Sequence, residues 1–192
     1  MAILLANSAP TIGEKQRYAV NGVSYADPDT PLKLADYFNI PGVFNLSAIK
    51  SSPSANGSMP ATLATAVLPT SLHQFIEIVF QNDEDTMQSW HLDGYDFWPI
   101  GFGFGVWNET SQKNYNLVDA LTRHTTQVYP KSWSAIRVSL DNQGMWNLRS
   151  ALWERRYLGQ QLYLRVYNSV QSLANEYDIP SNALLCGRRL VD

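Results

Sequence analysis

The chain has 192 residues, of which 45% are hydrophobic, with 14 basic and 17 acidic side chains. This composition is typical of one globular domain with a substantial core, and the near balance of charge, without a basic patch, argues against a nucleic-acid partner. The sequence holds no apolar run of about 20 residues and therefore predicts no transmembrane segment, and its first residues do not resemble a signal peptide.

The first third of the chain predicts short strands, one helix and a loop. The run 18–29, YAVNGVSYADPD, is aromatic and broken by Gly, Pro and Asn, which favours strands and turns. In TPLKLADYF, Thr30 can accept hydrogen bonds from first-turn amides and Pro31 suits the first helical position, so a helix is expected. The segment 45–70 is rich in Ser, Pro, Ala and Thr and is expected to be an exposed loop.

Three later segments alternate with a period of two, the spacing of a half-buried strand. Their shared faces carry Ile76, Ile78 and Phe80; Ile136, Val138 and Leu140; and Leu162, Leu164 and Val166. The run 97–107, FWPIGFGFGVW, favours a further strand and turns. A second helix is expected over 169–180, because apolar residues fall on one face and Pro180 bounds the run. We therefore predict an all-β sandwich or barrel with short peripheral helices.

Residues suited to catalysis or metal binding are scarce. The histidines are His73, His91 and His124, none within helical reach of another, and Cys186 is the single cysteine, so no metal-binding pair of histidines or cysteines is present. The acidic run NDEDT from Asn82 is interpreted as a solvated turn, with calcium binding as an alternative.

Several aromatic side chains surround the segment SWHLDGYDFW, residues 89–98. We expect them to pack in the core and at the mouth of the barrel, with stacking on carbohydrate as the alternative. They are Trp90, Phe97, Trp98, Phe102, Phe104 and Trp107.

Three tripeptides match the acceptor for N-linked glycan, at Asn45, Asn56 and Asn108. Two of them lie in the segment expected to be an exposed loop. We expect Asn56 to be modified if the chain is secreted, because its neighbours offer no apolar face for burial.

A series of motifs runs through nearly the whole chain. In order they are NSAP and YAVNGVSY, WHLDGYDFWPIGFGFG, LVDALTRHTTQVYPKSWSAIRVSLDNQGMWNLRS, WERRYLGQQLYLRV and NALLCG. This order of segments resembles the C-terminal third of plant multicopper oxidases. The likeness is most marked for ascorbate-oxidase-like proteins of the pollen-specific and skewed-growth subgroup. The resemblance implies a cupredoxin fold, a Greek-key β-barrel, with 1–192 as a single plastocyanin-like domain equivalent to the third of three. The chain would then be a fragment that lacks the first two domains.

Copper-bearing members of this family carry two ligand motifs that are altered here. The motif His-Pro-x-His-Leu-His-Gly-His falls on residues 88–95, where the type 1, type 2 and type 3 histidines match Gln88, His91 and Asp93. The His-Cys-His motif, with its later histidine and axial group, falls on Arg149, Ser150, Ala151, Arg155 and Gln160. Of these matched positions, only position 91 keeps the histidine that serves as a copper ligand in the family.

These substitutions predict that no copper binds and that no residue is catalytic. A serine hydroxyl cannot replace the thiolate of a blue copper site, and a guanidinium has no lone pair to offer a metal. We expect His91 to remain as a packed, hydrogen-bonded residue that holds the turn before Gly94. We also expect Asp93 and Arg149 to form an ion pair, which could be bidentate, at an exposed rim.

The resemblance implies a copper-free, non-catalytic domain of a secreted plant glycoprotein that acts by binding in the cell wall or at the cell surface, in directional growth or pollen. The alternatives are a copper-dependent oxidoreductase and a non-functional fragment. Expected partners are cell-wall carbohydrate or the first and second cupredoxin domains. Cys186, whose family counterpart bonds to the first domain, is expected to be unpaired here.

Overall fold

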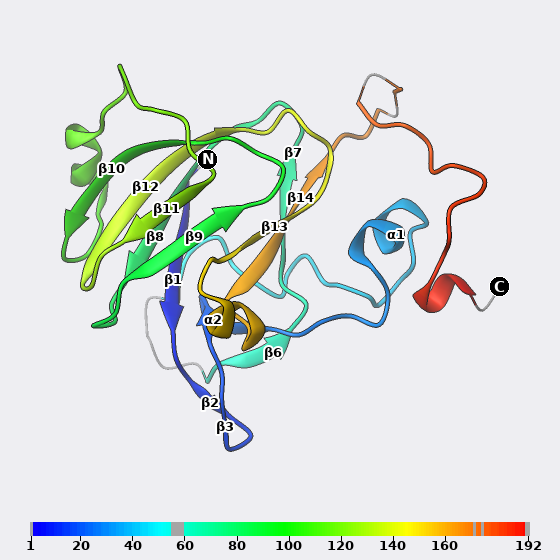
Figure 1. The fold of residues 1–192 in the computed structure, drawn as a ribbon, viewed down its shortest axis with the longest axis horizontal. Coiled ribbons are helices and arrows are strands. Elements are labelled where there is room, and N and C mark those ends of the chain that lie inside the picture. The colour runs from blue at the N-terminus through cyan, green and yellow to red at the C-terminus, as the bar shows by residue number, and fades with distance from the viewer. Residues whose placement is uncertain (1, 55–59, 171, 174, 191–192) are drawn as a thin grey trace.

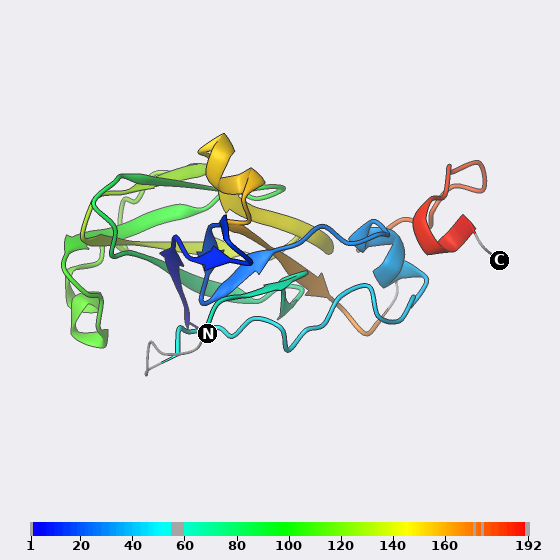
Figure 2. The same ribbon diagram turned by 90° about the horizontal axis from the view of Figure 1, so that it is seen from below.

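The strands of the molecule form two sheets that pack face to face as a sandwich (Figure 1 and Figure 2). The computed structural model describes residues 2–54, 60–170, 172–173 and 175–190. The seven-stranded sheet has the order β10 (Trp98–Phe104), β12 (Ser132–Ser139), β8 (Phe75–Asn82), β1 (Ala2–Ser8), β4 (Ala19–Val20), β5 (Val23–Tyr25) and β6 (Thr62–Ala64). The five-stranded sheet has the order β11 (Thr125–Val128), β9 (Gln88–Leu92), β13 (Gly144–Ser150), β14 (Gln161–Tyr167) and β7 (Val67–Ser71). A small hairpin joins β2 (Thr11–Ile12) to β3 (Lys15–Gln16).

The main core lies between the two sheets and confirms the predicted strands. The alternating residues of β8, β12 and β14 are buried there. Phe80 of the seven-stranded sheet stacks on Trp90 of the five-stranded sheet with ring centroids 5.0 Å apart. The expectation that β8 is half-buried is wrong, because its outer face is also covered, with Val79 packed among Ile100 and Trp133.

The helix expected after Thr30 is present as α1 (Leu32–Tyr37), although Thr30 does not cap it. The Thr30 hydroxyl donates to Asp29 Oδ1 at 3.0 Å and accepts from the backbone N–H of Arg188 at 3.0 Å. The hydroxyl therefore ties the C-terminal segment to the start of α1 instead of satisfying the first turn.

The helix expected over 169–180 is absent from the described residues of that range. Its proposed apolar face has no core to pack against, since Val170, Leu173 and Tyr177 are all exposed, and a short helix without tertiary packing is marginal in water. Three short elements were not expected from the sequence: the helix α2 (Trp153–Tyr157) and the 3₁₀ turns η1 (Glu109–Asn114) and η2 (Gly187–Leu190).

The expectation of an exposed loop over 45–70 is wrong for much of that segment. It contains β6 and the first residues of β7, and Ile49, Ala66 and Val67 are buried. Ile49 and Ala66 pack in the main core and Val67 packs against α1, roles that the small polar residues around them obscure in the sequence. Among the described residues, no helix has the length and apolar character to cross a membrane.

Candidate functional site

Strand β9 divides the altered ligand positions between the two faces of its sheet. Gln88, Trp90 and Leu92 are buried, whereas His91 points to the outer face. The register places His91 between Thr125 of β11 and Arg149 of β13. Because side chains alternate along a strand, positions that match the type 1 copper ligands face inward and those that match the type 2 and type 3 ligands face outward.

The outer group is a polar cluster in which Asp93 contacts two cationic or potentially cationic side chains. Arg149 Nη1 donates to Asp93 Oδ1 at 2.5 Å, and His91 Nε2 lies 3.1 Å from the same oxygen. The other ring nitrogen of His91 is 2.9 Å from Thr125 Oγ1. The expected ion pair is therefore formed, with one contact instead of two, and the Asp93 side chain is 42% exposed.

His91 is hydrogen-bonded as expected, and its contact with Asp93 reaches the turn before Gly94, on which Trp146 also packs. Gly94 has a φ of +76°, and a Cβ there would lie 2.2 Å from the Trp146 ring, so the ring packs directly on the backbone of the turn. Tyr95 is buried and its hydroxyl donates to the Asn142 carbonyl. Burial raises the pKa of the Tyr95 hydroxyl well above its ordinary value. The turn is fixed by this packing.

The inner group is a buried chain of hydrogen bonds. Gln160 Nε2 donates to Gln88 Oε1 at 3.0 Å, and Arg155 Nη1 donates to Gln160 Oε1 at 3.2 Å. Gln88 and Gln160 are fully buried and Arg155 is 6% exposed. The resemblance matches four positions to type 1 ligands, Gln88, Ser150, Arg155 and Gln160, and three of them are thus joined in one chain of hydrogen bonds.

Glu84 completes this inner group and was not expected. Arg155 donates to Glu84 Oε1 at 3.0 Å and to Oε2 at 2.6 Å, and Asn7 Nδ2 donates to Oε1 at 2.6 Å. Burial alone would raise the pKa of Glu84, but these hydrogen bonds and the Arg155 charge hold that pKa below its ordinary value. The interpretation of the acidic run as a solvated turn is therefore wrong for Glu84, whereas the Asp85 side chain is 89% exposed. We call Glu84, Gln88, Arg155 and Gln160 the buried polar network.

The donor atoms at the altered positions do not fit a copper site. The inward positions supply two amides, a guanidinium bound to a carboxylate, and the Ser150 hydroxyl, which accepts from the Leu152 backbone N–H at 3.2 Å. None is a thiolate or an imidazole, the ligands of a blue copper site. Of the outward positions, the Ala151 side chain has no atom that could bind a metal, and the Arg149 guanidinium donates a hydrogen bond to Asp93. Within the described residues, no group of three or more His, Cys, Asp or Glu side chains is arranged to hold a metal ion.

The other predicted sites lie apart from these clusters. Asn45 and Asn108 are exposed, Asn56 lies outside the described residues, and Cys186 is exposed and free. The Asn108 side chain accepts from the backbone N–H of Thr110 and begins η1.

The six aromatic side chains near residues 89–98 differ in burial. Trp90 and Phe97 are buried, and Trp98 and Trp107 are partly buried. Phe102 and Phe104 are 76% and 85% exposed, so the core assignment is wrong for these two. They alternate with glycines on β10, an edge strand of the seven-stranded sheet.

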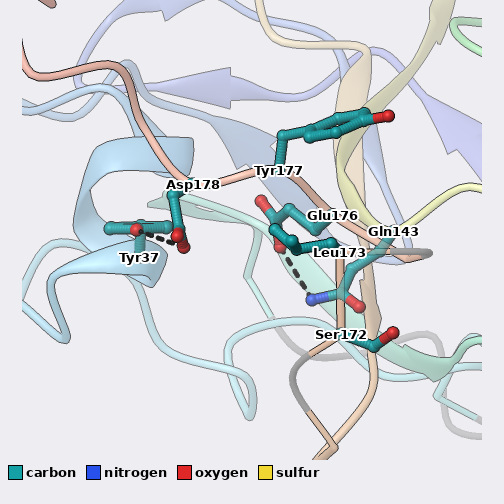
Figure 3. A pocket seen from close by; sticks show the side chains of 7 residues that line it. All are labelled: Tyr37, Gln143, Ser172, Leu173, Glu176, Tyr177 and Asp178. Carbon is teal, nitrogen blue, oxygen red and sulfur yellow. Dashed lines mark hydrogen bonds between the residues drawn. The ribbon is translucent and has the colours of Figure 1, made fainter.

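A hollow of about 210 Å³ lies where the C-terminal segment contacts α1 (Figure 3). Gln143 donates to Glu176 Oε2 at 2.8 Å, Lys33 pairs with Glu176, and the Tyr37 hydroxyl donates to Asp178 at 3.3 Å. These polar groups bind each other across the hollow. The contacts attach the C-terminal segment to α1 and offer few free groups to a ligand.

Comparison with known proteins agrees with the fold. The multicopper oxidase family model matches residues 29–172. The chain is 47% identical over 186 residues to an "L-ascorbate oxidase homolog" of Brassica napus, covering 96% of this chain and 34% of that protein. It is 41% identical over 185 residues to the "Monocopper oxidase-like protein SKU5" of Arabidopsis thaliana, covering 96% of this chain and 31% of that protein. The chain thus spans about a third of the length of these relatives.

Solved structures show the same fold at low sequence identity. The laccase from Botrytis aclada superposes with a TM-score of 0.69 at 19% identity, covering 85% of this chain and 28% of that chain. The multicopper oxidase Fet3p superposes with a TM-score of 0.68 at 19% identity, covering 86% and 31%. The two packed sheets are therefore a cupredoxin-like sandwich, and the chain belongs to the multicopper oxidase family.

Proposed function

We propose that this chain is a copper-free, non-catalytic plastocyanin-like domain, equivalent to the third domain of a three-domain protein, that acts by binding. The observation that carries the proposal is the buried polar network. Arg155 places a permanent positive charge beside the matched type 1 positions, and Glu84 neutralises it. A copper ion would have to displace this pair and would then meet amide and hydroxyl groups instead of sulfur and imidazole.

The direct test is metal binding by the purified chain. After incubation with copper and dialysis, we expect less than stoichiometric metal and no blue thiolate-to-copper absorption band. Arg155→His with Ser150→Cys would return two ligand types to the network and serves as a comparison for the spectroscopy. Stoichiometric copper in the unaltered chain, with a blue band, would overturn the proposal.

The rival function is that of a copper-dependent oxidoreductase, which family membership suggests. It requires ligands that Gln88, Ser150 and Arg155 do not provide, so we rank it second. A non-functional fragment is the third reading. It is tested by a thermal melt followed by circular dichroism, for which a copper-free binding domain should show one cooperative transition.

We further propose that the intact protein is a secreted plant glycoprotein of the cell wall or cell surface, with a role in directional growth or pollen. The relatives named above are plant proteins, and Asn45 and Asn108 are accessible to glycosylation. Peptide mapping of material secreted from plant cells should find glycan at Asn56, with Asn45 and Asn108 as further accessible acceptors. A wholly unmodified Asn56 would count against secretion through the glycosylating pathway.

A further inference from the structure

A groove of about 520 Å³ is lined by residues of β10 and β11 and of the segments beside them. These two strands are edge strands, one of each sheet (Figure 1). Its lining is mixed, with aromatic, amide and hydroxyl groups in close proximity. The residues that line it include Phe102 and Tyr129, Asn114 and Asn116, and Thr126 and Gln127. None of the altered copper positions lines it, so its role does not depend on whether copper is bound.

Two aromatic side chains that line the groove are exposed to solvent, whereas aromatic side chains are usually largely buried. Phe102 is 76% exposed and Tyr129 is 49% exposed. Phe102 keeps this position because its neighbours Gly101 and Gly103 let Tyr115 and Trp133 pack directly on the strand backbone. A Cβ at either glycine would lie within 2.9 Å of one of those rings. The aromatic face of the groove therefore rests on a rigid, close-packed strand.

The polar groups of the groove are neutral and partly unengaged. No charged residue is among its lining residues. Within the described part of the chain, the side-chain amides of Asn114 and Gln127 and the Tyr129 hydroxyl make no hydrogen bond. Neutral donors and acceptors beside exposed rings match the chemistry of a sugar, which has hydroxyl groups around its rim and apolar C–H faces.

The other occupant that a pair of sheet edges suggests is an added peptide strand, and the geometry of β10 disfavours it. Pro99 lacks a backbone N–H, and the pairing of β10 with β12 is irregular between Pro99 and Gly101. The Ile100 carbonyl already accepts from the Asn116 backbone N–H at 2.6 Å. A regular ladder of main-chain hydrogen bonds cannot extend along such an edge.

We propose that this groove binds a neutral oligosaccharide, with Phe102 and Tyr129 stacking on sugar faces and the amides of Asn114 and Gln127 binding hydroxyl groups. The proposal deepens the binding role proposed above by naming the class of ligand. The net charge of the chain is −3 and the groove has no cationic lining, so an acidic oligosaccharide should bind more weakly than a neutral one.

The test is calorimetric titration of the full chain with neutral β-1,4-linked hexasaccharides of glucose, xylose, mannose and galactose, and with hexagalacturonate as the acidic probe. Phe102→Ala should weaken binding of the best neutral probe about tenfold, because the lost stacking and contact area are worth about that factor. Phe104→Ala is the matched control, since Phe104 is also highly exposed, lies two residues along the same strand and is not among the residues that line the groove. It should change binding less than about twofold.

Binding of a neutral probe that depends on Phe102 and not on Phe104 would support the assignment. Binding by none of the four neutral probes, equal effects of the two variants, or preference for hexagalacturonate would overturn it. Binding of an unstructured peptide in the same groove, without sugar binding, would also overturn it. Copper content is measured on the same samples, so loss of the sugar proposal and loss of the copper-free proposal are separate results.

Discussion

Replacing Glu84 by Gln removes the negative charge from the buried polar network without changing the size of the side chain. In the native protein, Glu84 accepts two hydrogen bonds from Arg155 and one from Asn7. The glutamine keeps one acceptor oxygen and turns an NH₂ group toward the guanidinium. Arg155, of which the side chain is 7% exposed, then keeps its charge with no carboxylate to balance it.

The expected cost follows from the burial of the two partners. Removing one member of a fully buried ion pair costs about 3–5 kcal/mol, whereas breaking an exposed pair costs less than about 1 kcal/mol. Glu84 is 21% exposed and water can reach part of the site, so we expect a loss of about 2–4 kcal/mol in the free energy of unfolding. The guanidinium of Arg155 also lies 4.3 Å from the Tyr18 ring centroid, and this cation–π contact remains in the variant, which reduces the loss of stability.

Chemical denaturation measures this loss, with Asp85→Asn as the matched control. Asp85 follows Glu84 in the chain, and its side chain is 89% exposed and 3.3 Å from Lys131. Its neutralisation should cost less than about 1 kcal/mol. The double variant Glu84→Leu with Arg155→Met should recover stability relative to Glu84→Gln, because no charge then remains buried. Equal midpoints for Glu84→Gln and Asp85→Asn would refute the reasoning.

The remaining predictions concern the outer cluster, the turn at Gly94 and the response to acid. Asp93→Ala should cost less than about 1 kcal/mol in denaturation, because the Asp93 carboxylate is half-exposed and Arg149 can turn to water; a loss as large as that of Glu84→Gln would contradict it. Gly94→Ala should cost about 2–4 kcal/mol through left-handed strain and the clash with Trp146, whereas Gly13→Ala, at a φ of +55° with open space, should cost about 1 kcal/mol; equal losses would refute the clash. The pKa of Glu84 is held low in the folded state, so its contribution to the free energy of unfolding should be complete above about pH 5 and lost as the pH falls through the folded pKa. The stability of the native chain should therefore fall more steeply with acid than that of Glu84→Gln.

The sequence predicted the sandwich because its strands carry a clear period of two. Ile76, Ile78 and Phe80 identify β8 without help from any other segment, and β12 and β14 are equally plain. The helix expected over 169–180 failed for a physical reason. Helical spacing shows which residues would share a face, but it does not show whether anything packs on that face, and Leu173 and Tyr177 remain exposed. The strands β6 and β7 were missed because small and polar residues surround the few buried ones.

The altered copper positions were located by the resemblance, and the outer pair of Asp93 and Arg149 followed from them. The partner of Arg155 did not follow, because Glu84 lies 71 residues away and is one of three adjacent acidic residues in a run that looks solvated. A general signal was nevertheless present. A permanently charged guanidinium at a buried position requires a carboxylate within reach, and the run from Asn82 precedes β9, the strand that carries Gln88.

The two clusters differ in what they can do for the molecule. In the outer cluster, His91, Asp93 and Arg149 are within reach of water, so their contacts are weak and exchange easily with solvent. In the buried polar network, each group has a fixed partner, and the chain of hydrogen bonds joins the loop before β9 to α2 and the start of β14. Gln88, Arg155 and Gln160, three of the matched copper positions, belong to this network. The network therefore cross-links these segments through hydrogen bonds and one ion pair, which supports the proposal of a copper-free domain that acts by binding.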